Sequence, residues 1–120
     1  MTGKYVDGFV VPVKKTEIET YRQIAATAGR VWKEYGALDY VECVADDVKP
    51  GKVTSFPQAV KLEDDEVVVF SWIVYESREQ RDRVNAAVMD DPRIKAMEGK
   101  QMPFDGMRMF WGGFQVLLTA

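Results

Sequence analysis

Residues 66–76, EVVVFSWIVYE, constrain the fold more than any other part of the sequence. Their β-branched and aromatic side chains predict a strand. An antiparallel sheet with helices on one face should alternate apolar and polar side chains along such a strand. Here one face carries Val67, Val69, Ile73 and Tyr75, and the other carries Val68, Phe70, Trp72 and Val74. We therefore expect this strand to be buried on both faces.

The rest of the chain predicts three more strands and two helices. The strands are expected at residues 5–13, 38–46 and 107–118, and the helices at residues 16–36 and 77–89. The order β-α-β-β-α-β is the ferredoxin-like arrangement of the α+β class, an antiparallel sheet with two helices on one face. A chain of 120 residues has the size of one domain, so we expect residues 1–120 to form a single domain.

Both helices begin at a predicted capping box, in which two side chains satisfy free backbone N–H groups. The first pair is Thr16 with Glu19, and the second is Ser77 with Gln80. Between the two halves, residues 59–62 (AVKL) are predicted as a short additional strand.

Two helices can cover only one face of a sheet, so the second apolar face needs another cover. We expect a homodimer in which the sheets of two copies pack face to face through an isologous interface. The alternative is that residues 47–58, which are polar and rich in turn residues, fold over this face as a long loop. Loops seldom seal a sheet, and the sequence therefore favours the dimer.

The chain contains no histidine, which excludes several kinds of site. Histidine is the commonest general base and metal ligand, and it activates serine and cysteine nucleophiles. The acidic pairs lack the spacing of a calcium-binding EF-hand loop. We therefore expect neither a metal site nor a cofactor.

The charge composition also limits which classes of binding partner are expected. With 16 basic and 19 acidic residues, the net charge of −3 does not favour nucleic acid. The sequence has no apolar run of the roughly 20 residues needed to cross a bilayer, so no membrane partner is expected. The single cysteine, Cys43, fits a reducing compartment, and we expect a cytoplasmic protein.

The stretch MPFDGMRMFWGGF, at residues 102–114, allows a structural and a functional interpretation. Structurally, Pro103 and Gly106 form a turn, and Gly112 and Gly113 indicate a β-bulge or the close approach of another chain. Functionally, Arg108 would bind a carboxylate or phenolate as a fixed cation beside an apolar pocket. The structural interpretation is favoured, and the functional one stays open.

A second group of polar and aromatic residues completes the predicted pocket. Trp72 would form one wall, and Asn85 would either position a ligand or make local hydrogen bonds. The candidate ligand-binding residues are Trp72, Asn85, Met102, Phe104, Asp105, Arg108 and Trp111.

Motifs along the whole chain resemble those of the YbaA-like family, a group of small bacterial proteins carried as a domain of unknown function. The resemblance lies in YVDGFVV, GAL, VEC, GKVT, AVK, VVFSWIVY, the RD…N…DPR run and MPFDG followed by RM and GGF. This family is similar to the dimeric α/β-barrel superfamily, whose ferredoxin-like units pair through their sheets. The superfamily includes cofactor-free monooxygenases, haem-degrading enzymes, isomerases and ligand-binding proteins, so the resemblance implies a fold and a dimer but no single reaction.

Three functions remain open from the sequence. The first is binding of a small apolar or aromatic molecule, including an anionic one, in a cavity between sheet and helices. The second is a cofactor-free monooxygenase-like or isomerase-like enzyme acting on a small aromatic or quinone substrate. The third is a dimeric interaction module without a ligand.

Overall fold

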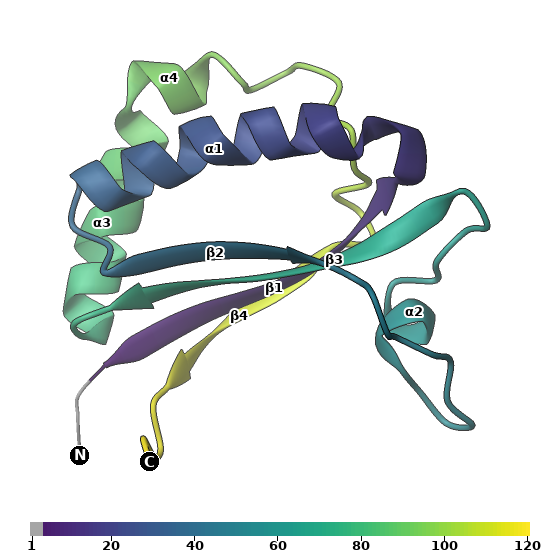
Figure 1. Ribbon diagram of the computed structural model, residues 1–120. Helices are drawn as coiled ribbons and strands as arrows, with labels where there is room; N and C mark the ends of the chain where they lie inside the picture. The colour runs from purple at the N-terminus through teal and green to yellow at the C-terminus, as the bar shows by residue number, and fades with distance from the viewer. Residues whose placement is uncertain (1–3) are drawn as a thin grey trace.

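The computed structural model describes residues 4–120 and has the predicted order of elements (Figure 1). The strands are β1 (Tyr5–Lys14), β2 (Asp39–Val44), β3 (Glu66–Tyr75) and β4 (Phe110–Gln115). The long helices are α1 (Ile18–Glu34), which follows a single 3-10 turn, and α3 (Arg78–Asp90). Two short helices are α2 (Phe56–Ala59) and α4 (Pro92–Lys95).

The four strands form one antiparallel sheet in the order β2-β3-β1-β4. Helices α1, α3 and α4 lie over one face, while α2 and its loop lie beyond the other face at one end (Figure 1). This arrangement confirms the predicted ferredoxin-like fold of the α+β class. No helix within residues 4–120 is long and apolar enough to cross a membrane.

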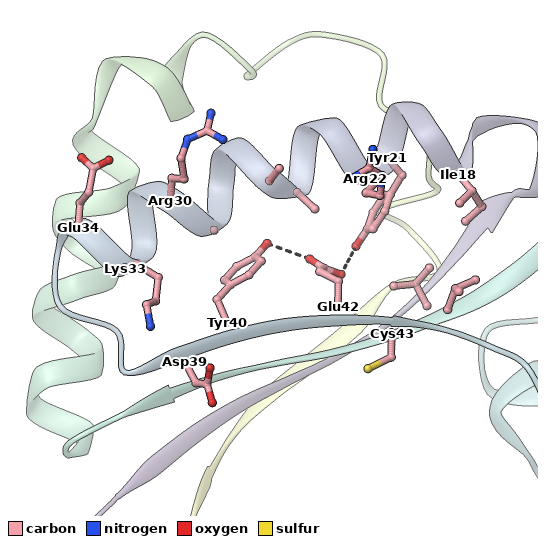
Figure 2. Close-up of a pocket in the computed structure, with 15 residues that line it drawn as sticks. Ile18, Tyr21, Arg22, Arg30, Lys33, Glu34, Asp39, Tyr40, Glu42 and Cys43 are labelled. Atoms are coloured by element: carbon pink, nitrogen blue, oxygen red, sulfur yellow. Dashed lines mark hydrogen bonds between the residues drawn. The ribbon is translucent and has the colours of Figure 1, made fainter.

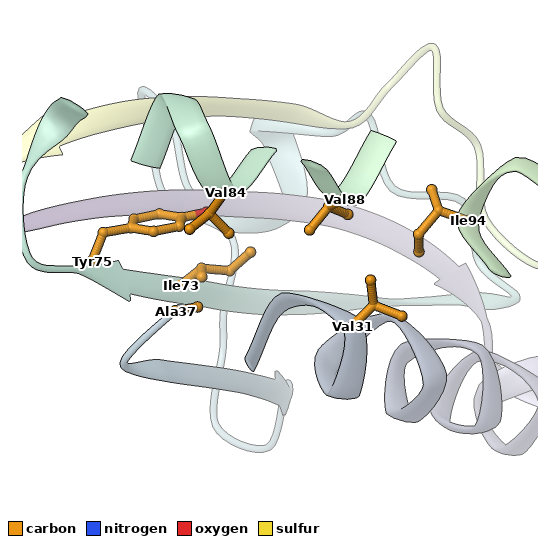
Figure 3. Packing of buried hydrophobic residues seen from close by; sticks show 7 residues of the cluster. All are labelled: Val31, Ala37, Ile73, Tyr75, Val84, Val88 and Ile94. Atoms are coloured by element: carbon orange, nitrogen blue, oxygen red, sulfur yellow. The ribbon is translucent and has the colours of Figure 1, made fainter. Parts of the chain in front are cut away.

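Alternation along β1 and β3 sorts their side chains between the two faces. Val11 pairs with Val69 and Val13 with Val67, and this row packs against the start of α1. The larger cluster on the helix side consists of Val31, Ala37, Ile73, Tyr75, Val84, Val88 and Ile94 (Figure 3). Burying one such large side chain contributes roughly 1.5–3 kcal/mol. The cluster therefore fixes α1, α3 and α4 on the sheet.

The opposite face of the sheet is apolar as predicted, but it is covered only at one end. There, Val60 packs with Val10 and Val68 of the two central strands. Phe70, opposite Val10, meets the Phe56 ring of α2 edge-on but is still 41% exposed, and farther along the face Phe114 is 64% exposed. The loop that contains α2 therefore leaves most of the face open, and we call this uncovered area the open sheet face.

The predicted bulge in the last strand is wrong. The ladder between β1 and β4 is continuous, with Gly8 opposite Gly112 and Asp7 opposite Gly113. Gly113 is explained by the close approach of another part of the same chain, because a β-carbon at this position would collide with the Arg81 guanidinium. The strand is also shorter than expected and begins at Phe110.

Two local predictions fail and one is confirmed at the helix ends. Thr16 lies in the 3-10 turn, so α1 begins two residues later, after Glu17. Residues 59–62 are not a strand, because Ala59 is the last residue of the short helix α2, which Ser55 caps, and a turn follows it. Ser77 caps α3 as predicted, accepting a hydrogen bond from the backbone N–H of Gln80 at 3.1 Å, while the Gln80 side chain accepts from the backbone N–H of Glu76 and not from that of Ser77.

Candidate functional site

A cavity of about 400 Å³ lies between the sheet and the helices, and we call it the inner cavity. Its wall combines side chains from β1 and α1 with side chains from the irregular segment between α4 and β4. The main apolar lining residues are Phe9, Trp32, Met97, Met102, Phe104 and Met109. This volume falls within the roughly 300–1,000 Å³ that is typical of small-molecule sites.

A second hollow of about 660 Å³ lies between α1 and β2, and we call it the outer groove (Figure 2). Tyr21, Ala25, Tyr40 and Glu42 line both hollows. The two hollows therefore adjoin at this group, which places Glu42 where a ligand entering from the groove would meet the cavity.

Glu42 is held by two tyrosines that come from different elements. The Tyr21 hydroxyl, on α1, donates to Glu42 Oε1 at 2.7 Å, and the Tyr40 hydroxyl, on β2, donates to Oε2 at 2.8 Å (Figure 2). Burial, followed by the nearby charge of Glu42, raises the pKa of both tyrosines above the ordinary value of 10.0. Both phenols therefore remain protonated donors at neutral pH.

A glycine on α1 allows Tyr40 to take this position. A β-carbon on Gly29 would lie 2.8 Å from Tyr40 Cδ1, closer than van der Waals contact permits. The Tyr40 ring also packs against Trp32, with 6.0 Å between ring centroids. Both contacts hold the hydroxyl of Tyr40 toward Glu42 rather than toward solvent.

A second polar cluster lies deeper, beneath α3. The carboxylate of Asp7, which is 1% exposed, accepts from Arg81 Nε at 3.0 Å and from the Tyr75 hydroxyl at 3.1 Å. Asn85 Oδ1 accepts from Trp32 Nε1 at 2.9 Å and lies 3.2 Å from the Tyr75 hydroxyl, whose single proton is shared between Asn85 and Asp7. Burial, and then the charge of Asp7, raises the pKa of Tyr75. This cluster joins β1, β3, α1 and α3, and its polar groups are satisfied from within the chain.

Arg108 belongs to a third polar cluster, at the N-terminal end of β3. Its two terminal nitrogens donate to the carboxylate of Glu66 at 2.7 and 2.6 Å, and its Nε donates to Asp105 at 2.8 Å. These hydrogen bonds raise the pKa of Arg108 and lower the pKa values of both acids. Arg108 thus fastens the turn before β4 to the start of β3.

The predicted site residues are divided among these places. Met102 and Phe104 line the inner cavity, while Asn85 reaches it only through its bond to Trp32. Trp72 lies on the open sheet face, and Trp111 stacks on Phe9 with 6.0 Å between ring centroids. Asp105 and Arg108 pair with each other. The ligand-binding roles of all seven residues stay predictions.

The sequence did not point to Tyr21, Tyr40 and Glu42, the three hydrogen-bonded residues among the four at the junction of the two hollows. One signal was present: Tyr21 lies on the apolar face of the first helix, and Tyr40 and Glu42 alternate on one strand. Glu42 lies in the VEC motif, but that motif assigns it no role, and its contact with Tyr21 depends on tertiary packing. Among residues 4–120, no group of three or more histidine, cysteine or acidic side chains is arranged to hold a metal ion.

Comparison with known proteins gives a family and close relatives. The model of a family described as "Protein of unknown function (DUF1428)" matches residues 4–106. The "Uncharacterized protein YbaA" of Escherichia coli (strain K12) is 55% identical over 115 residues, covering 96% of this chain and 97% of the relative. The protein with the same description from Shigella flexneri matches equally.

Similar solved structures share the fold at low sequence identity. SnoaB, a cofactor-independent oxygenase from Streptomyces nogalater, has a TM-score of 0.60 at 12% identity, covering 98% of this chain and 96% of its own. A dimeric ferredoxin-like protein from an uncultured marine organism has a TM-score of 0.63 at 10% identity, covering 98% of each chain. A putative antibiotic biosynthesis monooxygenase from Nitrosomonas europaea has a TM-score of 0.55 at 11% identity, covering 98% and 93%.

Proposed function

We infer that this chain, which belongs to the DUF1428 family of proteins of unknown function, binds a small apolar or aromatic molecule in its inner cavity. The observation that carries this proposal is the pairing of an apolar cavity of about 400 Å³ with one localised polar group. Ligand sites typically combine an apolar lining with a few placed polar groups that fix the ligand's orientation.

The composition of the cavity wall supports an aromatic ligand. Phe9, Trp32 and Phe104 offer ring faces, and aromatic pairs contribute about 0.5–1.5 kcal/mol beyond the burial of their area. Met97, Met102 and Met109 add flexible side chains that adjust to an irregular ligand. The wall between α4 and β4 is therefore suited to admit rigid flat molecules of more than one shape.

An enzymatic role is the second candidate. The likeness to SnoaB, described as a cofactor-independent oxygenase, supports chemistry on an aromatic substrate that itself reacts with oxygen. In this chain Glu42 would accept a hydrogen bond from such a substrate. Oxygen consumption with a hydroquinone, measured for the wild type and for Glu42→Gln, separates an enzyme from a binding protein.

The open sheet face supports a homodimer. Phe70, Phe110 and Phe114 expose 41, 46 and 64% of their surface on this face, and Trp72 lies among them in the register. A similar structure is described as dimeric and ferredoxin-like. A second copy would offer the same apolar surface and bury both, as an isologous interface requires. The single cysteine, Cys43, supports a cytoplasmic location for this dimer.

Native mass spectrometry of the purified protein, followed by denaturation, tests both proposals. A dimer that carries an additional small mass, released on denaturation, would support the cavity ligand and identify it. A dimer without added mass that also fails to bind naphthalene-sized aromatic molecules in calorimetry would overturn the binding proposal and favour an interaction module. A monomer at micromolar concentration would overturn the dimer.

A further inference from the structure

We propose that Glu42 selects a ligand that carries a hydroxyl group, so that the molecule bound in the inner cavity is a neutral phenol or alcohol and not a carboxylate. The inference rests on the proposed function, because it concerns the ligand of the same cavity. It follows from the hydrogen-bonding capacity left over after Tyr21 and Tyr40 have bound the carboxylate.

The two tyrosines have no proton left to offer. Each phenol carries one O–H, and both are donated to Glu42, at 2.7 and 2.8 Å. What the Tyr21–Glu42–Tyr40 group still presents to the hollow is a set of oxygen lone pairs. A ligand that binds there without breaking these bonds must therefore supply the hydrogen, as a hydroxyl does and a carboxylate does not.

The charge of Glu42 works in the same direction. A carboxylate ligand would face a second carboxylate inside a mostly apolar hollow, where repulsion is poorly screened. The cations that line the outer groove make their hydrogen bonds with other groups than Glu42. Arg22 binds Glu19, Arg30 binds the Thr27 hydroxyl, and Lys33 donates to the carbonyl of Leu38 at 2.8 Å. Within residues 4–120, the hydrogen bonds to the carboxylate of Glu42 come from the two tyrosines and not from these cations.

Ser71 could donate a hydrogen bond to the same ligand hydroxyl from which Glu42 would accept one. It is the register partner of Glu42 on the neighbouring strand, and both side chains line the inner cavity. Within residues 4–120 its hydroxyl has no hydrogen-bond partner, although the residue is only 5% exposed. A ligand hydroxyl at this point would donate to Glu42 and accept from Ser71, which uses both capacities of an O–H group.

Calorimetric titration with three flat molecules of matched shape tests the inference. The probes are 2-naphthol, naphthalene and 2-naphthoate, which differ only in the polar group. A hydrogen bond to a charged acceptor is roughly twice as strong as a neutral one. We expect 2-naphthol to bind the wild type at least about tenfold tighter than either of the other two probes.

Two variants assign the preference to the carboxylate. Glu42→Gln should reduce the preference for 2-naphthol to about threefold or less and should improve binding of 2-naphthoate, because the amide is neutral and also donates. Glu79→Gln, at an exposed position in the first turn of α3, is the matched control, since it makes the same change of side chain away from both hollows, and the preference should persist.

The outcomes separate this inference from the function on which it rests. If none of the probes binds the wild type, the proposed function fails. If naphthalene binds as well as 2-naphthol, or if 2-naphthoate binds most tightly, the cavity binds ligands but the hydroxyl inference is overturned. An unchanged preference in Glu42→Gln overturns it as well. Should that variant not fold, the comparison of the three probes on the wild type still decides.

Discussion

Gly113 of β4 lies against the guanidinium of Arg81, at the point where Arg81 binds the buried carboxylate of Asp7. A β-carbon at position 113 would overlap both Arg81 and the hydroxyl of Tyr5. The absence of a side chain on β4 thus makes room for an ion pair between α3 and β1.

Replacing this glycine by alanine should destabilise the protein. Gly113→Ala would push Arg81 away from Asp7, and overpacking of this kind costs about 1–3 kcal/mol in the free energy of unfolding. Urea denaturation followed by circular dichroism measures the change. Gly106→Ala is the control, because no atom lies within 4 Å of the added carbon and the change should be near zero. Equal stability of the two variants would contradict the prediction.

The Arg108–Glu66 pair predicts a pH-dependent loss of stability. Arg108→Met would leave Glu66, whose side chain is 4% exposed, without its charged partner. We expect the midpoint of thermal unfolding at pH 7 to fall by about 5–10 °C. Arg83→Met, on the exposed side of α3, should change it by less than about 2 °C.

The sign of the pH dependence follows from the direction of the pKa shift. Arg108 lowers the pKa of Glu66 below its ordinary value of 4.5, so the pair's contribution is complete above that value and is lost as the pH falls through the lower, folded-state pKa. The difference between wild type and Arg108→Met should therefore be largest above pH 5 and should shrink as the pH falls below about 4. A constant difference from pH 7 to pH 3 would argue against the pair as its source.

Charge on the open sheet face should prevent the proposed dimer. Phe114→Glu places a carboxylate where two apolar faces would meet, so we expect a monomer in size-exclusion chromatography with light scattering. Met107→Glu is the matched control, because Met107 is 95% exposed in the turn before β4 and should leave the dimer intact. A dimeric Phe114→Glu variant would show that the chain associates through another surface.

Filling the inner cavity should abolish ligand binding without unfolding the protein. Ala28 lines this cavity on α1, so the ring of Ala28→Phe would occupy the volume that 2-naphthol needs. We expect at least a tenfold loss of affinity in calorimetry. Ala86→Phe, on the exposed side of α3, is the control and should bind as the wild type does. Equal loss in both variants would place the ligand elsewhere.

The fold was predictable because its determinants are local and repetitive. Alternation in residues 66–76 assigned Val69 and Phe70 to opposite faces, and the ladder with β1 confirms that assignment. The helix N-cap at Ser77 could also be predicted from the sequence, because the capping residue and its partner Gln80 are only three positions apart. The N-terminus of α2 was missed because Ser55, followed by Phe56 and Pro57, starts a helix too short to show a period.

The candidate site was harder to predict because it depends on which residues packing brings together. Arg108 was expected to face a ligand, yet the turn at Asp105 directs it to Glu66, more than forty positions earlier in the chain. Glu42 was not identified as a candidate, because the residues next to it in the sequence do not indicate that the Tyr21 hydroxyl will donate a hydrogen bond to it. Clustering in sequence identified Met102 and Phe104 on the cavity wall, but not the polar group that they surround.

The position of β1 in the sheet has a consequence for how the protein is made. β1 is synthesised before the other three strands of this sheet, yet one of its edges is paired by β4, which follows all of them in the sequence. Until that strand leaves the ribosome, the nascent chain exposes an unpaired edge and the apolar side chains beside it. Such edges recruit strands from other chains. Completion of the sheet therefore waits for the synthesis of β4, and a stalled or truncated chain that lacks β4 would be a substrate for chaperones and for aggregation.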